Sequence, residues 1–147
     1  MGAIYNVGDS VGWTNNGSFN YKSWSSTKTF QVGDTIVFEY KPQFDNVVRV
    51  THKNFNSCNS TAGYYNLSSG ADSITIMKPG HFFFISGFPG HCLSGQKVDI
   101  RVGSGLQPTS PAQSPAPSPH YKNAAISISS SSCLFFFLVF LASTFVY

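Results

Sequence analysis

Apolar residues recur at every second position in several short segments of the chain. In residues 35–40 the side chains of Ile36, Phe38 and Tyr40 fall on one side, and residues 97–102 repeat this alternation. A period of two is that of a β-strand with one face buried and the other exposed. The alternation therefore predicts half-buried strands rather than amphipathic helices.

Seven short strands are predicted, each bounded by turn-forming residues such as Gly33-Asp34 and Pro79-Gly80. They cover residues 4–7, 29–32, 35–40, 47–50, 73–76, 82–86 and 97–102. Short strands at regular spacing favour an all-β fold, an antiparallel Greek-key sandwich or barrel. Any helix is expected to be short, with residues 21–24 as the candidate.

Composition limits the chain to one folded domain with accessory segments. The 147 residues are 41% hydrophobic and 16% aromatic, which suits a single β-rich core. The net charge is +3, only 10% of residues are charged, and Lys and Arg form no cluster. Nucleic acid is therefore not expected as a partner. The folded domain is assigned to residues 1–102.

Residues 103–123 are rich in Pro, Ser and Ala, a composition that cannot bury enough apolar surface to fold. We expect an extended stalk. Its Ser-Pro and Ala-Pro dipeptides resemble the glycomodules of plant arabinogalactan proteins, in which sugar is attached to hydroxylated proline. A bare linker is the alternative.

Residues 124–147 are predicted to be a removable signal for a glycosylphosphatidylinositol (GPI) anchor. The apolar run 133–147 is fifteen residues long, short of the roughly 20 that span a bilayer. A serine-rich spacer precedes it, and small residues begin at Asn123, the expected attachment site. A retained membrane helix and attachment near Ser129 are the alternatives.

Further features bear on export to the cell surface. Asn16, Asn59 and Asn66 each begin an N-glycosylation sequon. The N-terminus lacks the charged and apolar regions of a signal peptide, so we expect the native precursor to begin earlier. The predicted location is the extracellular face of the plasma membrane, with membrane contact through the lipid anchor.

Two cysteines, Cys58 and Cys92, remain once the anchor signal with Cys133 is removed. An exported domain with two cysteines is expected to form one disulfide. Such a bridge would contribute roughly 4 kcal/mol on the chain-entropy model. Two free thiols are the alternative.

Residues 82–102 read FFFISGFPGHCLSGQKVDIRV, which resembles the C-terminal signature of the phytocyanins, the plant blue copper proteins of stellacyanin type. The resemblance also covers YNVGD at residues 5–9, the segment 21–34 and KPQFDNV at residues 41–47, and hence nearly all of residues 4–102. It implies a cupredoxin-like fold in which Cys58 and Cys92 form the structural disulfide of the family.

By the same resemblance, the four copper-ligand positions of the family are occupied here by Asp45, Ser86, His91 and Gln96. Two match the family pattern, but Asp45 stands in place of a His and Ser86 in place of a Cys. A blue copper centre needs a thiolate with two imidazoles, and a serine hydroxyl is a hard donor that does not ionise as a thiol does. The sequence therefore predicts a lost metal site and no bound cofactor. In this it resembles the early nodulin-like proteins, the phytocyanin branch without copper.

The function expected from these features is a non-redox binding module at the cell surface, monomeric, with a cell-wall glycan or an extracellular protein as partner. Phe88, Pro89 and Gly90, beside His91, are candidate contact residues, with packing within the loop as the alternative. The alternatives are blue-copper-type electron transfer and a weak Zn(II) or Cu(II) site formed by residual ligands. Ser86, His91 and Asp45 are also the residue types of a catalytic triad. No nucleophile elbow accompanies them, so enzymatic activity is not expected.

Overall fold

The computed structural model describes residues 1–104, and the predicted anchor signal and Asn123 lie outside the described residues, as does the stalk from residue 105 onward. Its elements in chain order are β1 (Ile4–Asn6), a 3-10 turn (Asp9–Val11), α1 (Tyr21–Ser26), β2 (Thr35–Glu39), β3 (Val47–Val50), α2 (His52–Ser57), β4 (Tyr65–Leu67), β5 (Ala71–Thr75), β6 (Gly80–Ile85) and β7 (Lys97–Val102). No helix within residues 1–104 combines the length and apolar content needed to cross a membrane.

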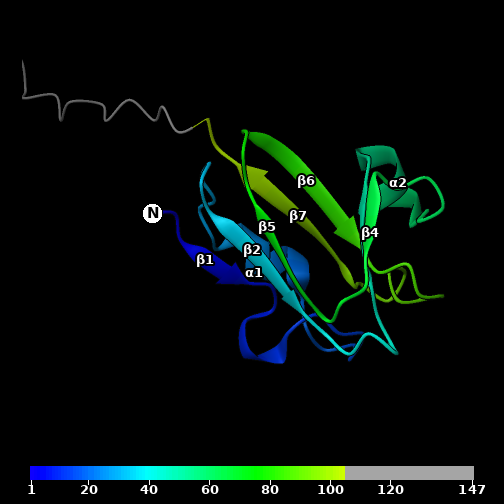
Figure 1. The fold of residues 1–147 in the computed structure, drawn as a ribbon. Helices are drawn as coiled ribbons and strands as arrows, with labels where there is room; N and C mark the ends of the chain where they lie inside the picture. Colours follow the sequence, from blue (N-terminus) through cyan, green and yellow to red (C-terminus); the bar gives the residue numbers. More distant parts are fainter. Residues whose placement is uncertain (105–147) are drawn as a thin grey trace, which may run out of the picture. The chain divides into compact units, whose positions relative to one another are not determined.

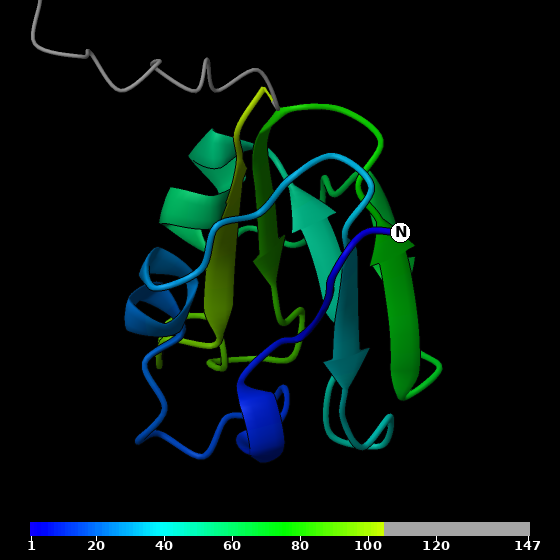
Figure 2. The same cartoon turned by 90° about the vertical axis from the view of Figure 1, so that its left-hand side faces the viewer.

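The strands form two sheets that face each other, as Figures 1 and 2 show. One sheet has the order β1-β2-β5 and the other the order β4-β3-β6-β7. They do not close into a barrel, so the architecture is a β-sandwich with few and short helices. The predicted all-β fold is confirmed.

The first strand differs from the wholly antiparallel arrangement that was predicted. β1 pairs with β2 in parallel, with Ile4 opposite Thr35 and Asn6 opposite Val37. Parallel neighbours need a crossover of a dozen residues or more. The long segment between Asn6 and Thr35, which contains α1, provides it.

One further strand prediction was wrong, and two short elements were missed. Residues 29–32 form no strand and contribute a single bridge, between Phe30 and Val102. β4 was missed because Tyr65 and Asn66 are exposed and give no alternation signal. The helix α2 was missed because it is short and polar; it begins where the Thr51 side chain accepts a hydrogen bond from the backbone N–H of Asn54.

The alternating residues of β2 and β7 enter the core as predicted. Ile36 and Phe38 of β2 and Val98 and Ile100 of β7 are all buried, and they pack with Phe84 of β6 and with the aromatic residues of the first thirty positions. A smaller cluster of Val48, Val50, Ile85 and Cys92 lies against Phe55 of α2.

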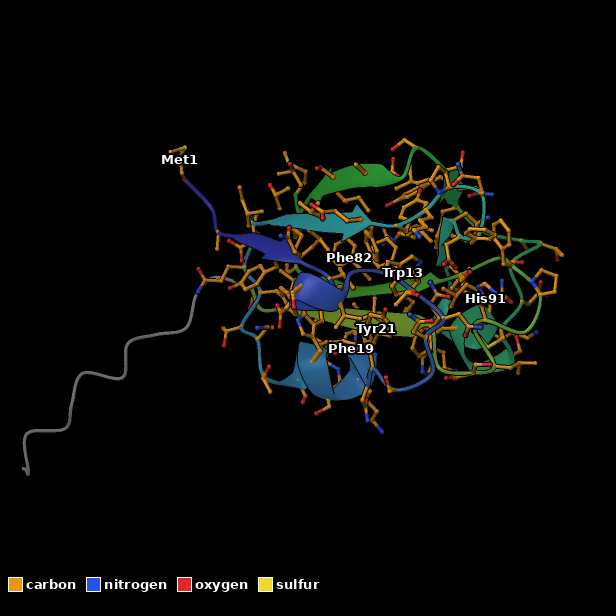
Figure 3. The ribbon with its side chains drawn as sticks, turned by 90° about the horizontal axis from the view of Figure 1, so that it is seen from below. Met1, Trp13, Phe19, Tyr21, Phe82 and His91 are labelled. Atoms are coloured by element: carbon orange, nitrogen blue, oxygen red, sulfur yellow. A yellow bond between two sulfur atoms is a disulfide. The ribbon has the colours of Figure 1, made fainter. Side chains whose placement is uncertain are left out.

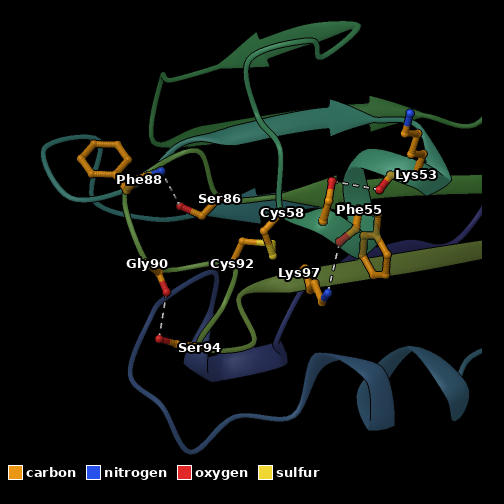
Figure 4. The surroundings of a disulfide bond; sticks show 10 residues. Lys53, Phe55, Cys58, Ser86, Phe88, Gly90, Cys92, Ser94 and Lys97 are labelled. Atoms are coloured by element: carbon orange, nitrogen blue, oxygen red, sulfur yellow. Dashed lines mark hydrogen bonds between the residues drawn. A yellow bond between two sulfur atoms is a disulfide. The ribbon is translucent and has the colours of Figure 1, made fainter.

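The disulfide between Cys58 and Cys92 is formed, which confirms the predicted pairing. Cys58 caps the C-terminus of α2, and Cys92 lies in the loop between β6 and β7 (Figure 4). The bridge therefore ties α2 to the loop that contains His91.

Buried aromatic residues fix the loop after the 3-10 turn (Figure 3). The indole N–H of Trp13 donates to the carbonyl of Asn46 at 2.9 Å. The Tyr21 hydroxyl donates to the carbonyl of Gly12 at 2.7 Å and accepts from the N–H of Thr14 at 2.8 Å. These contacts hold the loop against the segment that carries Asp45.

All three sequon asparagines, Asn16, Asn59 and Asn66, are exposed. Asn59 Oδ1 accepts hydrogen bonds from the backbone N–H of Thr61 at 3.0 Å and from its hydroxyl at 2.7 Å. The exposure is compatible with sugar attachment, and N-glycosylation stays a prediction.

Candidate functional site

Asp45, Ser86 and His91 lie together in the loops at one end of the sandwich. His91 is far from Met1 in the view of Figure 3. Asp45 closes a turn in which its backbone N–H donates to the carbonyl of Lys41 at 3.0 Å. Ser86 directly follows β6, and His91 belongs to the turn that precedes β7. Segments forty residues apart in sequence thus meet at one point.

A single carboxylate oxygen of Asp45 joins the three side chains. The Ser86 hydroxyl donates to Asp45 Oδ1 at 3.1 Å, and His91 Nδ1 lies 2.9 Å from the same oxygen. Because a carboxylate only accepts, Nδ1 carries a proton. Asp45 is 5% exposed, and a buried carboxylate is tolerated only with such partners. The contact with His91 is an ion pair when the imidazole is protonated.

Neighbouring backbone groups hold this cluster in place. The N–H of Phe88 donates to the Ser86 hydroxyl at 3.3 Å, as Figure 4 shows. The N–H of Gly87 donates to the Asn46 side chain, Oδ1, at 2.6 Å. The Phe88 ring stacks on the His91 imidazole with 5.7 Å between centroids. Asn46 was not identified from the sequence, although it directly follows Asp45 in the KPQFDNV segment.

Gln96, the fourth predicted position, is joined to the cluster through its backbone. Its carbonyl accepts from the Ser86 N–H at 3.1 Å, and its N–H donates to the His91 carbonyl at 3.0 Å. The side chain is 1% exposed, and neither its amide nitrogen nor its oxygen has a hydrogen-bond partner within the described part of the chain. A buried carboxamide without partners is uncommon in folded proteins.

Two tyrosines add neutral hydroxyls near the Asp45 carboxylate. Burial raises the pKa of Tyr40 to about 12, assisted by the hydrogen bond from its hydroxyl to the Asp72 carboxylate. Burial also raises the pKa of Tyr21, with the Asp45 charge acting in the same direction. Both phenols therefore stay protonated at neutral pH and add no further negative charge around Asp45.

Comparison with known proteins assigns the family. Residues 13–96 match the family model for a plastocyanin-like domain. Stellacyanin of Toxicodendron vernicifluum is 42% identical over 103 residues, which cover 67% of this chain and 95% of that protein. The basic blue protein of Cucumis sativus is 45% identical over 100 residues, which cover 68% of this chain and 99% of that protein. The chain belongs to the phytocyanin family.

A solved structure supports the cupredoxin fold of this phytocyanin. The cucumber basic protein, described as a blue copper protein, superimposes with a TM-score of 0.62 at 44% identity, covering 69% of this chain and all of that one. Early nodulin-like protein 1 of Arabidopsis thaliana is 37% identical, covering 78% of this chain and 31% of that protein. A protein described as a blue copper protein and one named as an early nodulin-like protein are thus both similar to this phytocyanin.

The prediction that the protein takes no cofactor is contradicted by these relatives. They include proteins named basic blue protein and blue copper protein, so the family of this chain points to copper. The prediction was wrong because it treated the donor atoms at two positions as decisive for metal binding. Donor identity determines the kind of copper centre that a chain can form.

The side chains of this phytocyanin do not fit a blue copper centre. Both cysteines within residues 1–104 are joined to each other in the disulfide, so this part of the chain offers no thiolate. Within the same residues, no group of three or more His, Cys, Asp or Glu side chains is placed to hold a metal ion. At the four ligand positions the donors are one imidazole and the oxygens of Asp45, Ser86 and Gln96. Copper held at this end of the sandwich would therefore have nitrogen and oxygen donors.

The side chains also do not form a serine-hydrolase arrangement. A triad needs the serine to donate to the histidine, and the histidine in turn to the aspartate. Here Ser86 and His91 both bond to Asp45, so the carboxylate lies between them. The imidazole is thus not placed to remove the serine proton.

We predict that Asp45→Ala lowers the free energy of unfolding by about 1–3 kcal/mol, because the Ser86 hydroxyl and the His91 imidazole lose their acceptor. Asp45→Asn keeps an oxygen at this position and is the matched control, with a smaller loss. Chemical denaturation of both variants measures the difference. An alanine variant within about 0.5 kcal/mol of the wild type would contradict the role assigned to Asp45.

Proposed function

We propose that this phytocyanin is a binding protein of the cell surface, glycosylated and held by a lipid anchor, and that it does not carry out blue-copper electron transfer. The observation that carries the proposal is the Asp45 carboxylate, which occupies the family's copper-ligand end and binds Ser86 and His91. The Ser86 oxygen replaces the thiolate on which a fast one-electron copper couple depends, and the Asp45 oxygen replaces an imidazole.

The exposed residues around the cluster suit contact with a partner. Phe44 is 62% exposed and lines the same hollow as Asp45 and His91. Leu93, in the same loop as His91, is 81% exposed. Exposed apolar side chains beside a hollow are compatible with a contact surface. A cell-wall glycan or an extracellular protein is the proposed partner, and the protein is proposed to act as a monomer without enzymatic activity.

Weak binding of Cu(II) or Zn(II) is a second candidate function. It is favoured by Gln96, whose buried carboxamide has no hydrogen-bond partner in residues 1–104. Its oxygen, with Asp45 and His91, gives an oxygen and nitrogen donor set that both ions accept.

We predict that the protein loaded with Cu(II) has no intense visible absorption, because residues 1–104 offer no thiolate for charge transfer to the metal. The double variant Asp45→His/Ser86→Cys supplies the imidazole and the thiolate at the family positions, and it is expected to turn blue. The variant Asp45→His alone is the control without a thiol and should stay colourless.

A blue band in the wild type would contradict this proposal. A colourless double variant that is folded, with its introduced thiol free by thiol titration, would show that more than these two positions separates this site from a blue copper centre. That result would contradict the claim that the donor atoms at positions 45 and 86 determine the kind of copper centre.

The surface location is supported by the sequence beyond the described residues. Residues 124–147 have the small-residue site, spacer and short apolar tail of a GPI signal, and residues 103–123 have the composition of a glycosylated stalk. The exposed Asn16, Asn59 and Asn66 are compatible with passage through the secretory route.

We predict that a phospholipase specific for phosphatidylinositol releases the protein from intact cells, since a GPI anchor holds it only through lipid. Detergent extraction of the same cells is the control for total protein. Release by detergent but not by the phospholipase would indicate a retained membrane helix, and the anchor proposal would then be wrong.

A further inference from the structure

A second hollow, separate from the Asp45 cluster, lies over β7 between α1 and α2. It has a volume of about 780 Å³, within the range of about 300–1,000 Å³ common for ligand pockets. Figure 2 shows α1 and α2 on the same side of β7. Residues from both helices, from β6 and β7 and from the loop before α1 contribute to its lining. We call it the helix groove.

The helix groove has an excess of positive charge. Its lining includes Lys22, Lys97 and Arg101, against the single carboxylate of Asp99. Arg101 Nε donates to Asp99 at 2.8 Å, and His81 Nδ1 lies 3.2 Å from Asp99, so this carboxylate is already paired. Charge complementarity therefore favours an anionic ligand.

The Lys97 ammonium is held in a fixed position in the helix groove. It donates to the carbonyl of Phe55 at 3.1 Å and lies 4.7 Å from the centre of the Phe55 ring (Figure 4). An ammonium has three donors, and the Phe55 carbonyl accepts from one of them. The remaining donors suit a ligand carboxylate, and the side chain is already ordered for that contact.

Aromatic rings run across the helix groove beside these cations. Phe55 and Phe83 lie with 5.1 Å between centroids, and His52 is at the same distance from Phe83. Phe19 lines the wall near α1. Hydroxyl and amide groups complete the lining; they belong to Ser18, Asn20, Ser25, Ser26, Asn56 and Ser94. The groove thus combines aromatic side chains with hydrogen-bonding groups and positive charge.

From this combination we infer that the helix groove binds an acidic oligosaccharide, a chain of sugar rings that carry carboxylates. The C–H faces of sugar rings pack on aromatic rings, their hydroxyls pair with the serines and asparagines, and uronate carboxylates pair with Lys22, Lys97 and Arg101. An acidic peptide fits less well. β7 is the last strand of its sheet, but Phe30 bridges to Val102 and α1 packs on this strand, so a peptide cannot add along the edge.

Binding in the helix groove does not depend on the anchor or on the kind of copper centre. Only the identification of the natural ligand as a cell-wall polysaccharide rests on the proposed cell-surface location. The two proposals can therefore fail separately.

The test is calorimetric titration of the full chain in detergent with a linear oligomer of galacturonic acid. The variant Lys22→Gln/Arg101→Gln is expected to bind about tenfold more weakly, which corresponds to about 1.4 kcal/mol. The matched control Lys28→Gln/Lys78→Gln removes the same charge outside the helix groove and outside the hollow beside Asp45, and it is expected to change the affinity less than about twofold. A neutral galactose oligomer of equal length should bind at least about tenfold more weakly than the acidic oligomer.

Phe55→Leu separates a sugar site from a general cationic surface. Leucine keeps an apolar side chain against Phe83 but removes the flat ring, so the affinity for the acidic oligomer is expected to fall about threefold, near the lower end of aromatic contact energies. Thermal unfolding checks that this variant and both double variants are folded.

Absence of binding by the wild type would overturn the inference, and so would equal losses in the groove and control variants, which would indicate unspecific charge attraction. Loss in the control variant alone would place the sugar outside the helix groove, near Lys28 or Lys78. That outcome would overturn the helix groove but leave a glycan-binding role at the cell surface intact.

Discussion

The arrangement of the loops at the end of the sandwich that carries the candidate site depends on the hydrogen bonds made to the buried carboxylate of Asp45. Asp45 is 5% exposed, and its Oδ1 atom accepts hydrogen bonds from both Ser86 and His91. A buried anion without partners would cost several kcal/mol. This one oxygen atom therefore joins the three segments that supply these residues, together with the bond from the Gly87 N–H to Asn46, while the disulfide ties the His91 loop to α2.

Family membership and site chemistry lead to different conclusions about a blue copper centre in this phytocyanin. The sequence and the fold are similar to those of relatives named basic blue protein and blue copper protein. The donors at the ligand end do not include the thiolate that gives such centres their colour and potential. The fold tolerates substitutions at the ligand positions better than the site chemistry does. Buried apolar residues on β2, β6 and β7 fix the fold regardless of which polar groups occupy the loops.

Much of the fold could be predicted from the sequence because its strands alternate strongly. Residues 47–50 and 97–102 were predicted with the bounds that β3 and β7 have. Residues 29–32 were misjudged because a short apolar segment can bury one side chain, here Phe30, without joining a ladder. The parallel pairing of β1 depends on a long crossover, and local alternation contains no information about strand direction.

The position of Asp45 beside Ser86 and His91 was available only through the family resemblance. That Asp45 lies between the other two depends on side-chain packing, and the helix groove joins residues as distant in sequence as Lys22 and Lys97.

X-ray absorption at the copper edge, on the protein loaded with Cu(II), tests the central claim most directly because it identifies the elements bound to the metal. The account predicts nitrogen and oxygen neighbours only. A short copper–sulfur contact would contradict it, since that bond requires a thiolate where Ser86 now provides a hydroxyl oxygen.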